Sequence, residues 1–276
     1  MKRNHKLLLY DDYCPLCSWY SGLFVKFGLL QSDNRVPFSR ADLSVLTTID
    51  IEKAKDEIPL YDPSTKQTLY GIDALLDILG QRLPFIRLAG NCRPVNWFLK
   101  KLYKFISYNR KVIIARKCGP GTFDCSPGFN PFYRVIFLLT FLLVNSLMLI
   151  PLHNEVFSQL SFYHISLAQL QTGHVIFLLI NCSLALFLSR KTAIEYLGQI
   201  NVLALVCILL LTVLMLMASL FSIPEWVITF FMGVITMFIL KEYFRRMKYA
   251  GILAHHRTIV QVNILCLAGF LAYVFH

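Results

Sequence analysis

The sequence predicts an α/β N-terminal domain followed by an all-α transmembrane helical bundle of about five spans. Hydrophobic residues make up 56% of the 276-residue chain, whose mean hydropathy is +0.57, more than an ordinary soluble domain shows. The charge is uneven: up to Arg134 there are 20 Lys and Arg and 12 Asp and Glu, against 7 and 4 in the remainder. The chain opens with a strand-helix-strand pattern. Together with the uneven charge, this pattern predicts a soluble domain followed by a membrane segment.

The first predicted elements are a short strand at 6–10 and a helix that begins near Pro15. Apolar residues recur at helical spacing after Pro15, which suits a first helical turn because it lacks an N–H. These apolar residues are Leu16, Trp19, Tyr20, Leu23, Phe24 and Phe27. Cys14 and Cys17 therefore lie at the start of this helix, two residues apart.

The rest of the N-terminal segment predicts a second strand in "RVPFSRADL" and a strand, turn, strand and helix in "EIPLYDPSTKQTLYGIDALLDIL", with the turn at Asp62, Pro63 and Ser64. A β-α-β unit followed by a hairpin and a helix is the order of a thioredoxin-like fold, here over residues 1–110. Pro59 stands where thioredoxin-like proteins carry a cis-proline beside the active site. We therefore expect Pro59 to contribute to substrate binding.

The two cysteines predict redox chemistry. Unpaired N–H groups at a helix N-terminus favour a thiolate, so Cys14 is expected to attack a disulfide. Cys17, one turn later, is expected to resolve the mixed disulfide and close a disulfide with Cys14. Asp11 is expected to take or relay the Cys17 proton, or to cap the turn; these roles are compatible. No cofactor beyond this redox-active dithiol and no metal is predicted.

The run "YDDYCPLC" resembles the signature of the DCC family of thiol-disulfide oxidoreductases, whose aspartate and two cysteines correspond to Asp11, Cys14 and Cys17. The resemblance continues through "FSRADL" and "YGIDALLDIL" to about residue 110. It implies a thioredoxin-like fold and protein-disulfide reductase activity, with a protein disulfide or thiol as substrate and a separate electron donor. Asp12 departs from the glycine usual in the family, and its charge is expected to oppose thiolate formation at Cys14.

Residues 111–134 are predicted to be a linker rich in glycine and proline, in which Cys118 and Cys125 flank a turn. These two cysteines are either a second dithiol that exchanges with Cys14 or, as their cytosolic placement favours, a reduced structural loop. The segment before the linker, "RPVNWFLKKLYKFISYNRK", has apolar residues at helical spacing and lysines on other faces. It suits either the headgroup layer of an anionic membrane or a terminal helix packed on the domain.

Residues 135–276 are predicted to form the transmembrane domain, with spans at 135–152, 175–189, 199–221, 226–240 and 258–275. Lys and Arg occur in the two loops expected inside and are absent from those expected outside. This predicts a multi-pass protein of the bacterial inner membrane with a cytoplasmic N-terminal domain. Cys182, Cys207 and Cys266 fall in different predicted spans, where small apolar packing is the ordinary role of cysteine.

Other functions stay open. Cys14 and Cys17 are otherwise incidental thiols, or half of a zinc site completed by Cys118 with Cys125 or Cys92. The chain would then be a membrane transporter or assembly factor whose N-terminal domain is a binding or zinc-sensing module. The expected partners are the lipid bilayer and a thiol or disulfide protein. Nucleic acid is not expected, because the basic residues follow the membrane boundary.

Overall fold

The computed structural model describes residues 5–116 and 127–275. The chain divides into two compact units, Met1–Tyr133 and Arg134–His276, and each is described by itself. The predicted boundaries at 110 and 134 are not tested by this division, although the helix at the end of the first unit continues to Ile114.

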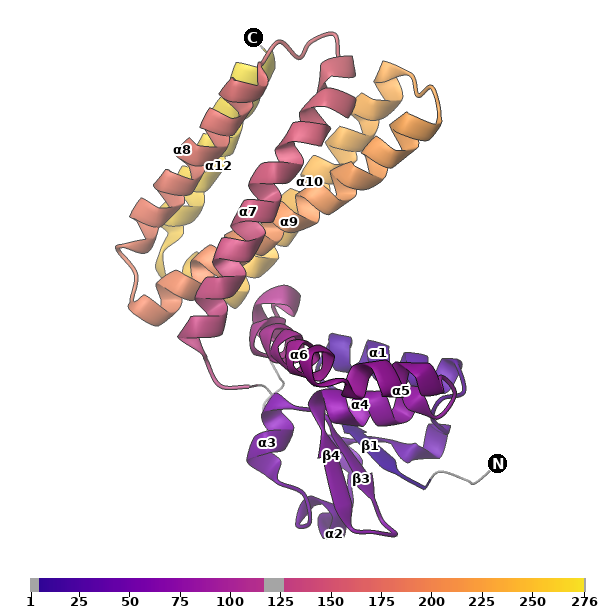
Figure 1. The fold of residues 1–276 in the computed structure, drawn as a ribbon. Coiled ribbons are helices and arrows are strands. Elements are labelled where there is room, and N and C mark those ends of the chain that lie inside the picture. Colours follow the sequence, from indigo (N-terminus) through magenta and orange to yellow (C-terminus); the bar gives the residue numbers. More distant parts are fainter. Residues whose placement is uncertain (1–4, 117–126, 276) are drawn as a thin grey trace. The chain divides into compact units, whose positions relative to one another are not determined.

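The first unit contains a small mixed sheet in the order β2-β1-β3-β4 (Figure 1). β1 pairs in parallel with β2, while β3 is antiparallel to both β1 and β4. The strands are β1 (Leu7–Tyr10), β2 (Arg35–Pro37), β3 (Pro59–Asp62) and β4 (Gln67–Tyr70). Each strand was predicted in its place. The β3–β4 turn closes because the Asp62 carboxylate accepts hydrogen bonds from the backbone N–H and hydroxyl of Ser64.

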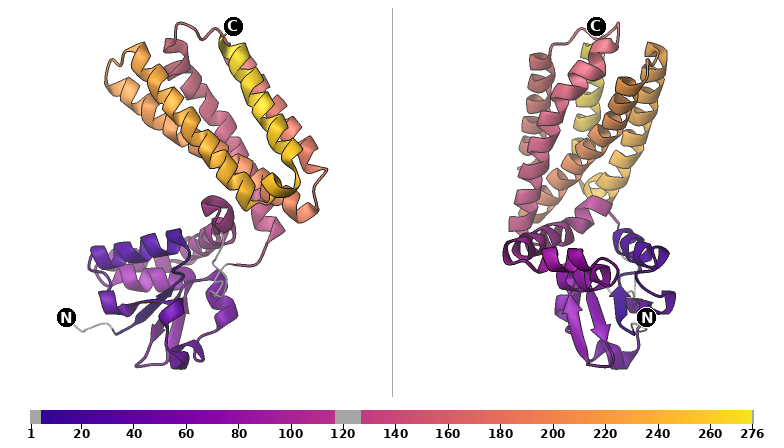
Figure 2. Two further views of the ribbon diagram at one scale, coloured as in Figure 1. Left: turned by 180° about the vertical axis from the view of Figure 1, so that it is seen from behind. Right: turned by 45° about the vertical axis from the view of Figure 1, so that its right-hand side comes forward.

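Helices cover both faces of this sheet. Leu8 and Leu60 point to one face, where they pack with residues of α1, α4 and α6, while Leu9 and Tyr61 pack on the other face with the α2–α3 segment. Helices α1, α4, α5 and α6 lie close together in both Figure 1 and Figure 2. The helices are α1 (Pro15–Lys26), α2 (Leu43–Leu46), α3 (Ile51–Asp56), α4 (Gly71–Gly80), α5 (Pro84–Asn91) and α6 (Arg93–Ile114).

The described residues of the second unit form helices joined by short loops, with no strand among them. Four of its helices are long and apolar enough to cross a membrane, which indicates a membrane protein. These four are α7 (Pro131–Glu155), α8 (Leu167–Ala185), α9 (Arg190–Leu220) and α10 (Glu225–Tyr249), and they are followed by α11 (Ile252–His255) and α12 (Arg257–Phe275). The division between the units falls within the first turn of α7.

The predicted fold class, a thioredoxin-like α/β domain followed by about five spans, is wrong. Helices make up 74% of the described residues, and the sheet has only four strands of three or four residues each. Strand and helix order along the chain did not reveal how much of the first unit would be helical, notably α5 and α6. In the described part of the chain four helices, not five, have the length and hydropathy of a membrane span. The fifth candidate lies in α12, whose apolar stretch Arg257–Tyr273 is shorter than the other four.

Buried polar side chains connect the helices of the second unit. Asn145 donates to the side-chain oxygen of Asn201 at 2.9 Å, and Asn263 donates to the Tyr196 hydroxyl at 2.8 Å. Polar side chains within apolar helices commonly hold neighbouring helices together in this way. One ion pair and one charge-assisted hydrogen bond add to it: Arg134 lies 3.5 Å from Glu195, and Arg246 donates to the Gln199 side-chain oxygen at 2.8 Å.

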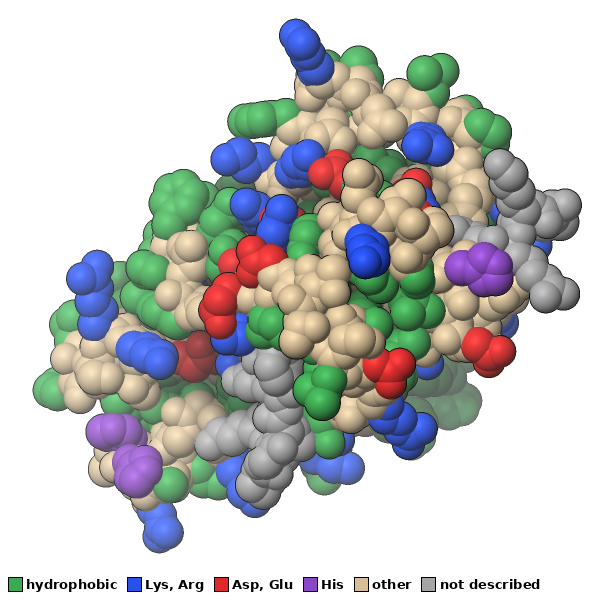
Figure 3. Space-filling view, turned by 90° about the horizontal axis from the view of Figure 1, so that it is seen from below, with side chains coloured by type: hydrophobic (Ala, Val, Ile, Leu, Met, Phe, Trp, Pro, Cys, Tyr) green, Lys and Arg blue, Asp and Glu red, His purple; other side chains and the backbone are tan. Residues whose placement is uncertain are grey.

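Charged side chains of both signs share the surface. On the face shown in Figure 3, Lys and Arg are spread among Asp and Glu instead of gathering in one patch. Within the first unit several are paired, for example Lys6 with Asp77 at 2.7 Å. A local excess of positive charge is found along helix α6, as described below.

Candidate active site at the N-terminus of α1

Cys14 is the N-cap residue of α1. Its backbone is extended (φ −93°, ψ 108°), Pro15 occupies the first helical position, and the Cys14 Sγ accepts a hydrogen bond from the Cys17 backbone N–H at 3.5 Å. The sulfur thus takes the place of the hydroxyl or carboxylate oxygen that usually caps a helix. This is the position predicted from the sequence, and the side chain is only 8% exposed.

The surroundings of Cys14 favour its thiolate. Hydrogen bonding from the Cys17 thiol lowers the pKa of Cys14 to about 6, helped by the Cys17 backbone N–H and the positive charge of Arg110. Burial and the negative charge of Asp11 act in the opposite direction. The Cys14 thiol is therefore mostly in the thiolate form at neutral pH, although the charge of Asp12 was expected to oppose this form.

Asp11 shapes the turn between β1 and α1. Its Oδ1 accepts hydrogen bonds from the backbone N–H of Tyr13 at 3.0 Å and of Cys14 at 3.2 Å. Its Oδ2 lies 3.8 Å from Nη2 of Arg110. Burial raises the pKa of Asp11, while Arg110 and the two N–H groups lower it. The predicted turn-capping role is therefore observed, and the proton-relay role stays a prediction.

Cys17 is buried on the first turn of α1 and contacts Arg110, whose Nη1 donates to the Cys17 Sγ at 3.4 Å. The hydrogen bond to Cys14 and burial raise the pKa of Cys17, while the charge of Arg110 lowers it. The two thiols are therefore unequal: Cys14 holds the negative charge and Cys17 holds the proton. An attacking and a resolving sulfur require this inequality.

Arg110 was not predicted as a site residue. It comes from α6, 93 residues after Cys17, and its side chain is 11% exposed. A second donor, Nη2, also contacts the Lys55 backbone oxygen at 3.3 Å, which fixes the guanidinium between α3 and α1. The sequence does contain one signal, the helical spacing that places Tyr103, Ser107 and Arg110 on one face of α6. In the structure all three residues of this face contact the segment 55–58.

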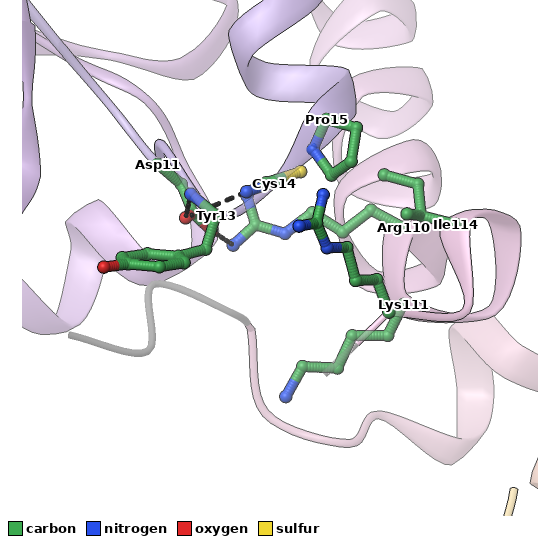
Figure 4. A pocket seen from close by; sticks show the side chains of 8 residues that line it. Asp11, Tyr13, Cys14, Pro15, Arg110, Lys111 and Ile114 are labelled. Atoms are coloured by element: carbon green, nitrogen blue, oxygen red, sulfur yellow. Dashed lines mark hydrogen bonds and ion pairs between the residues drawn. The ribbon is translucent and has the colours of Figure 1, made fainter. Parts of the chain in front are cut away.

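A shallow pocket of about 20 Å³ opens beside Cys14 (Figure 4). In the close-up, Asp11, Cys14 and Arg110 lie next to one another, with Lys111 and Ile114 reaching the pocket from α6. The lining residues are Asp11, Tyr13, Cys14, Pro15, Arg110, Lys111, Ile114 and Arg116. Because the pocket is small, a substrate would place little more than a sulfur atom and its nearest carbons there.

Pro59 does not line this pocket. It is the buried first residue of β3, where it pairs with Tyr70, and the structure has no cis peptide bond among its described residues. The Ile58–Pro59 bond is therefore trans, unlike the cis-proline on which the expectation of substrate binding was based. The role of Pro59 observed here is to begin the strand.

The remaining described cysteines do not join the site. Cys92, Cys182, Cys207 and Cys266 are free thiols, with Cys92 at the N-terminal end of α6 and the others in the helices of the second unit. Cys118 and Cys125 lie outside the described residues. Within the described ranges no group of three or more His, Cys, Asp and Glu side chains is arranged to hold a metal ion.

Comparisons with known proteins found no relative of this chain. No protein-family model matches the chain, and neither a curated protein nor a solved structure matches it. The chemistry of the site therefore rests on its own residues.

Proposed function

We propose that the chain is a membrane-anchored protein thiol-disulfide oxidoreductase that uses Cys14 and Cys17 as a dithiol/disulfide couple. The observation that carries this proposal is the Cys14 sulfur at the start of α1, with a pKa of about 6 and a hydrogen bond from the Cys17 N–H. The helix N-terminus at Cys14 and the Arg110 guanidinium, whose Nη1 lies 3.4 Å from the Cys17 sulfur, distinguish this pair from incidental buried thiols. The four apolar helices supply the membrane anchor.

In the reductive direction, the Cys14 thiolate attacks one sulfur of a substrate disulfide. A Cys14–substrate disulfide forms, the substrate S–S bond breaks, and the other substrate sulfur leaves and takes up a proton. Cys17 then gives up its proton and attacks the Cys14 sulfur, which releases the second substrate thiol and leaves a Cys14–Cys17 disulfide. Two electrons have passed to the substrate, and a separate dithiol donor returns the pair to its reduced form.

Arg110 and Asp11 act on the second step in this scheme. The Arg110 guanidinium stabilises a developing negative charge on the Cys17 sulfur, which its Nη1 already contacts. Asp11, held beside Arg110 and buried, is the nearby carboxylate proposed to receive the Cys17 proton directly or through water. Its raised pKa suits a group that must accept and return a proton.

Membership of the DCC family is part of this proposal and rests on Asp11, Cys14 and Cys17. The proposed location is a bacterial inner membrane with the first unit in the cytosol. Two groups of basic residues support this orientation, Arg190 and Lys191 at the start of α9 and the cluster between Lys241 and Arg257, because inner loops are enriched in Lys and Arg. In the cytosol the dithiol would be kept reduced between turnovers.

The test compares Cys14→Ser, Cys17→Ser and, as a matched control, Cys92→Ser in the full-length membrane protein. Cys14→Ser is expected to abolish reduction of a disulfide substrate, and Cys17→Ser to accumulate a mixed disulfide on Cys14, because the first removes the attacking sulfur and the second removes only the resolving one. Cys92→Ser is expected to behave as the parent protein. Mass spectrometry identifies the cysteine that carries the substrate.

Equal and mild effects of all three substitutions on disulfide reduction would contradict the proposed mechanism. Binding of one zinc ion per chain that Cys14→Ser and Cys17→Ser both abolish, without disulfide reduction, would instead favour a metal-sensing module.

A further inference from the structure

Helix α6 has a row of exposed apolar side chains that no residue in the described part of the first unit covers. The row consists of Val95, Phe98, Leu102 and Ile106, which follow one another at three or four residues and are 40%, 58%, 40% and 42% exposed. A soluble surface normally scatters such residues singly, and a continuous row marks an interaction site. We call these four residues the α6 stripe.

The stripe is not the face by which α6 packs on its own domain. That face carries Tyr103, whose hydroxyl accepts from the Ile58 N–H at 2.8 Å, and Ser107, which donates to the Asp56 oxygen at 2.6 Å. At 100° per residue the packed face and the stripe point in different directions. The two readings offered by the sequence for this segment, a packed terminal helix and a membrane-surface helix, are therefore compatible on a single helix.

The charge around the stripe indicates an anionic occupant. From Pro84 to Ile114 the chain has seven Lys and Arg and no Asp or Glu. Lys100 and Lys104 reach acidic residues of the domain at 2.9 and 3.6 Å, yet their side chains stay 49% and 44% exposed. An apolar stripe on one face of a helix whose other faces carry Lys and Arg and no acid is typical of helices that lie in the headgroup layer of anionic membranes.

A membrane is within reach of α6. Sixteen residues separate the end of α6 at Ile114 from the start of the first candidate span at Pro131. A chain of that length extends over at most about 55 Å, so α6 is confined to the neighbourhood of the bilayer surface. A tethered helix needs only weak intrinsic affinity, because the tether holds it at high effective concentration.

We propose that the α6 stripe lies in the headgroup layer of an anionic bilayer, with α6 parallel to the membrane plane. Lys101, on the face next to Phe98, contacts lipid phosphates, while Phe98 and Leu102 enter the boundary between headgroups and acyl chains. This inference does not depend on the redox chemistry proposed above, since it concerns a surface and not a thiol.

The test uses single-tryptophan forms of the full-length protein in vesicles of phosphatidylcholine and phosphatidylglycerol. The probe variant carries Phe98→Trp with Trp19→Phe, Trp97→Phe and Trp226→Phe. The control keeps Trp19, an α1 side chain 63% exposed, and carries Trp97→Phe and Trp226→Phe. Fluorescence is quenched either by doxyl-labelled lipid from the membrane or by acrylamide from water.

We expect lipid quenching of the Phe98→Trp probe to be several-fold stronger than that of the Trp19 control, and acrylamide quenching to be several-fold weaker. Without phosphatidylglycerol, lipid quenching of the probe is expected to weaken and its acrylamide quenching to strengthen, so that both differences from the control disappear. Acrylamide quenching equal to that of the control would overturn the proposal. Protection of the probe from both quenchers would also overturn it, because the stripe would then be covered by protein, and undiminished lipid quenching in phosphatidylcholine alone would rule out an anionic surface.

Discussion

The pKa difference between the two thiols can be tested by removing the hydrogen bond that contributes most to it. The thiol of Cys17 is the largest cause of the low Cys14 pKa, so Cys17→Ala is expected to raise that pKa. Cys17→Ser is the matched control, because a serine hydroxyl retains a donor at the same place. Both variants lack the resolving sulfur, so the first attack by Cys14 can be followed alone.

The size of the effect follows from the fraction of thiolate. At pH 7 a thiol with a pKa of about 6 is about 90% ionised, whereas at the ordinary value of 9.0 it is about 1% ionised. The loss of thiolate is partly offset, because a thiolate of higher pKa is intrinsically more nucleophilic, by about 20-fold over three pKa units. As an upper limit, Cys17→Ala would react about fivefold more slowly than the parent at pH 7 and about 20-fold faster above pH 9.

The assay is the rate of mixed-disulfide formation between Cys14 and a small neutral disulfide, measured from pH 5 to 10 by mass spectrometry of the Cys14 peptide. The Cys17→Ser rate is expected to fall as the pH decreases through the pKa of Cys14, which is about 6 when Cys17 supplies the hydrogen bond, because the thiolate then gains a proton. The Cys17→Ala profile should shift to higher pH and cross that of Cys17→Ser. Coinciding profiles for the two variants would refute the assigned cause of the low Cys14 pKa.

Three further predictions follow from contacts of α6 and from the charged loops. Arg110→Met is expected to raise the pKa of Cys14, since it removes an opposite charge, and to slow resolution by Cys17; pH-rate profiles test this, with Lys101→Met on the same helix as the control. Tyr103→Phe leaves the Ile58 N–H without its acceptor, at a cost of about 1–3 kcal/mol, and hydrogen exchange at Ile58 should accelerate accordingly. Cysteines introduced at 241–257 should resist an impermeant thiol reagent in intact cells, whereas those at 153–173 should react; the reverse pattern would invert the proposed orientation.

The local features of the site could be predicted from the sequence because they depend on neighbouring residues. An apolar run before Asp11, a proline after Cys14 and a helical pattern beyond it are sufficient to place Cys14 at a helix N-terminus. The four strands and the turn at Asp62 were located for the same reason. Sequence patterns of this length determine whether a segment is a strand or a helix, and they leave the assembly of segments undetermined.

The features that the sequence did not predict depend on contacts between distant segments. Arg110 reaches Cys17 only because α6 packs against the residues between α3 and β3. Trp19 and Phe27 fit the apolar pattern of α1, yet they are 63% and 61% exposed, because no element among the described residues covers these side chains. The fold class failed likewise, since element order does not fix the proportion of helix and sheet.

Helix α6 carries only basic charged residues, whereas the rest of the first unit has nearly equal numbers of basic and acidic residues. Its basic residues pair with carboxylates from other elements: Lys100 with Asp73, Lys104 with Glu57 and Arg110 with Asp11. The exposed pairs contribute little to stability, whereas the third is buried and lies at the thiols. An acidic residue in place of one of these basic residues would be repelled by the carboxylate that it faces and by an anionic membrane alike. The absence of Asp and Glu from this helix is therefore consistent with both of its roles, positioning Arg110 beside Cys17 and, as proposed, resting on the bilayer.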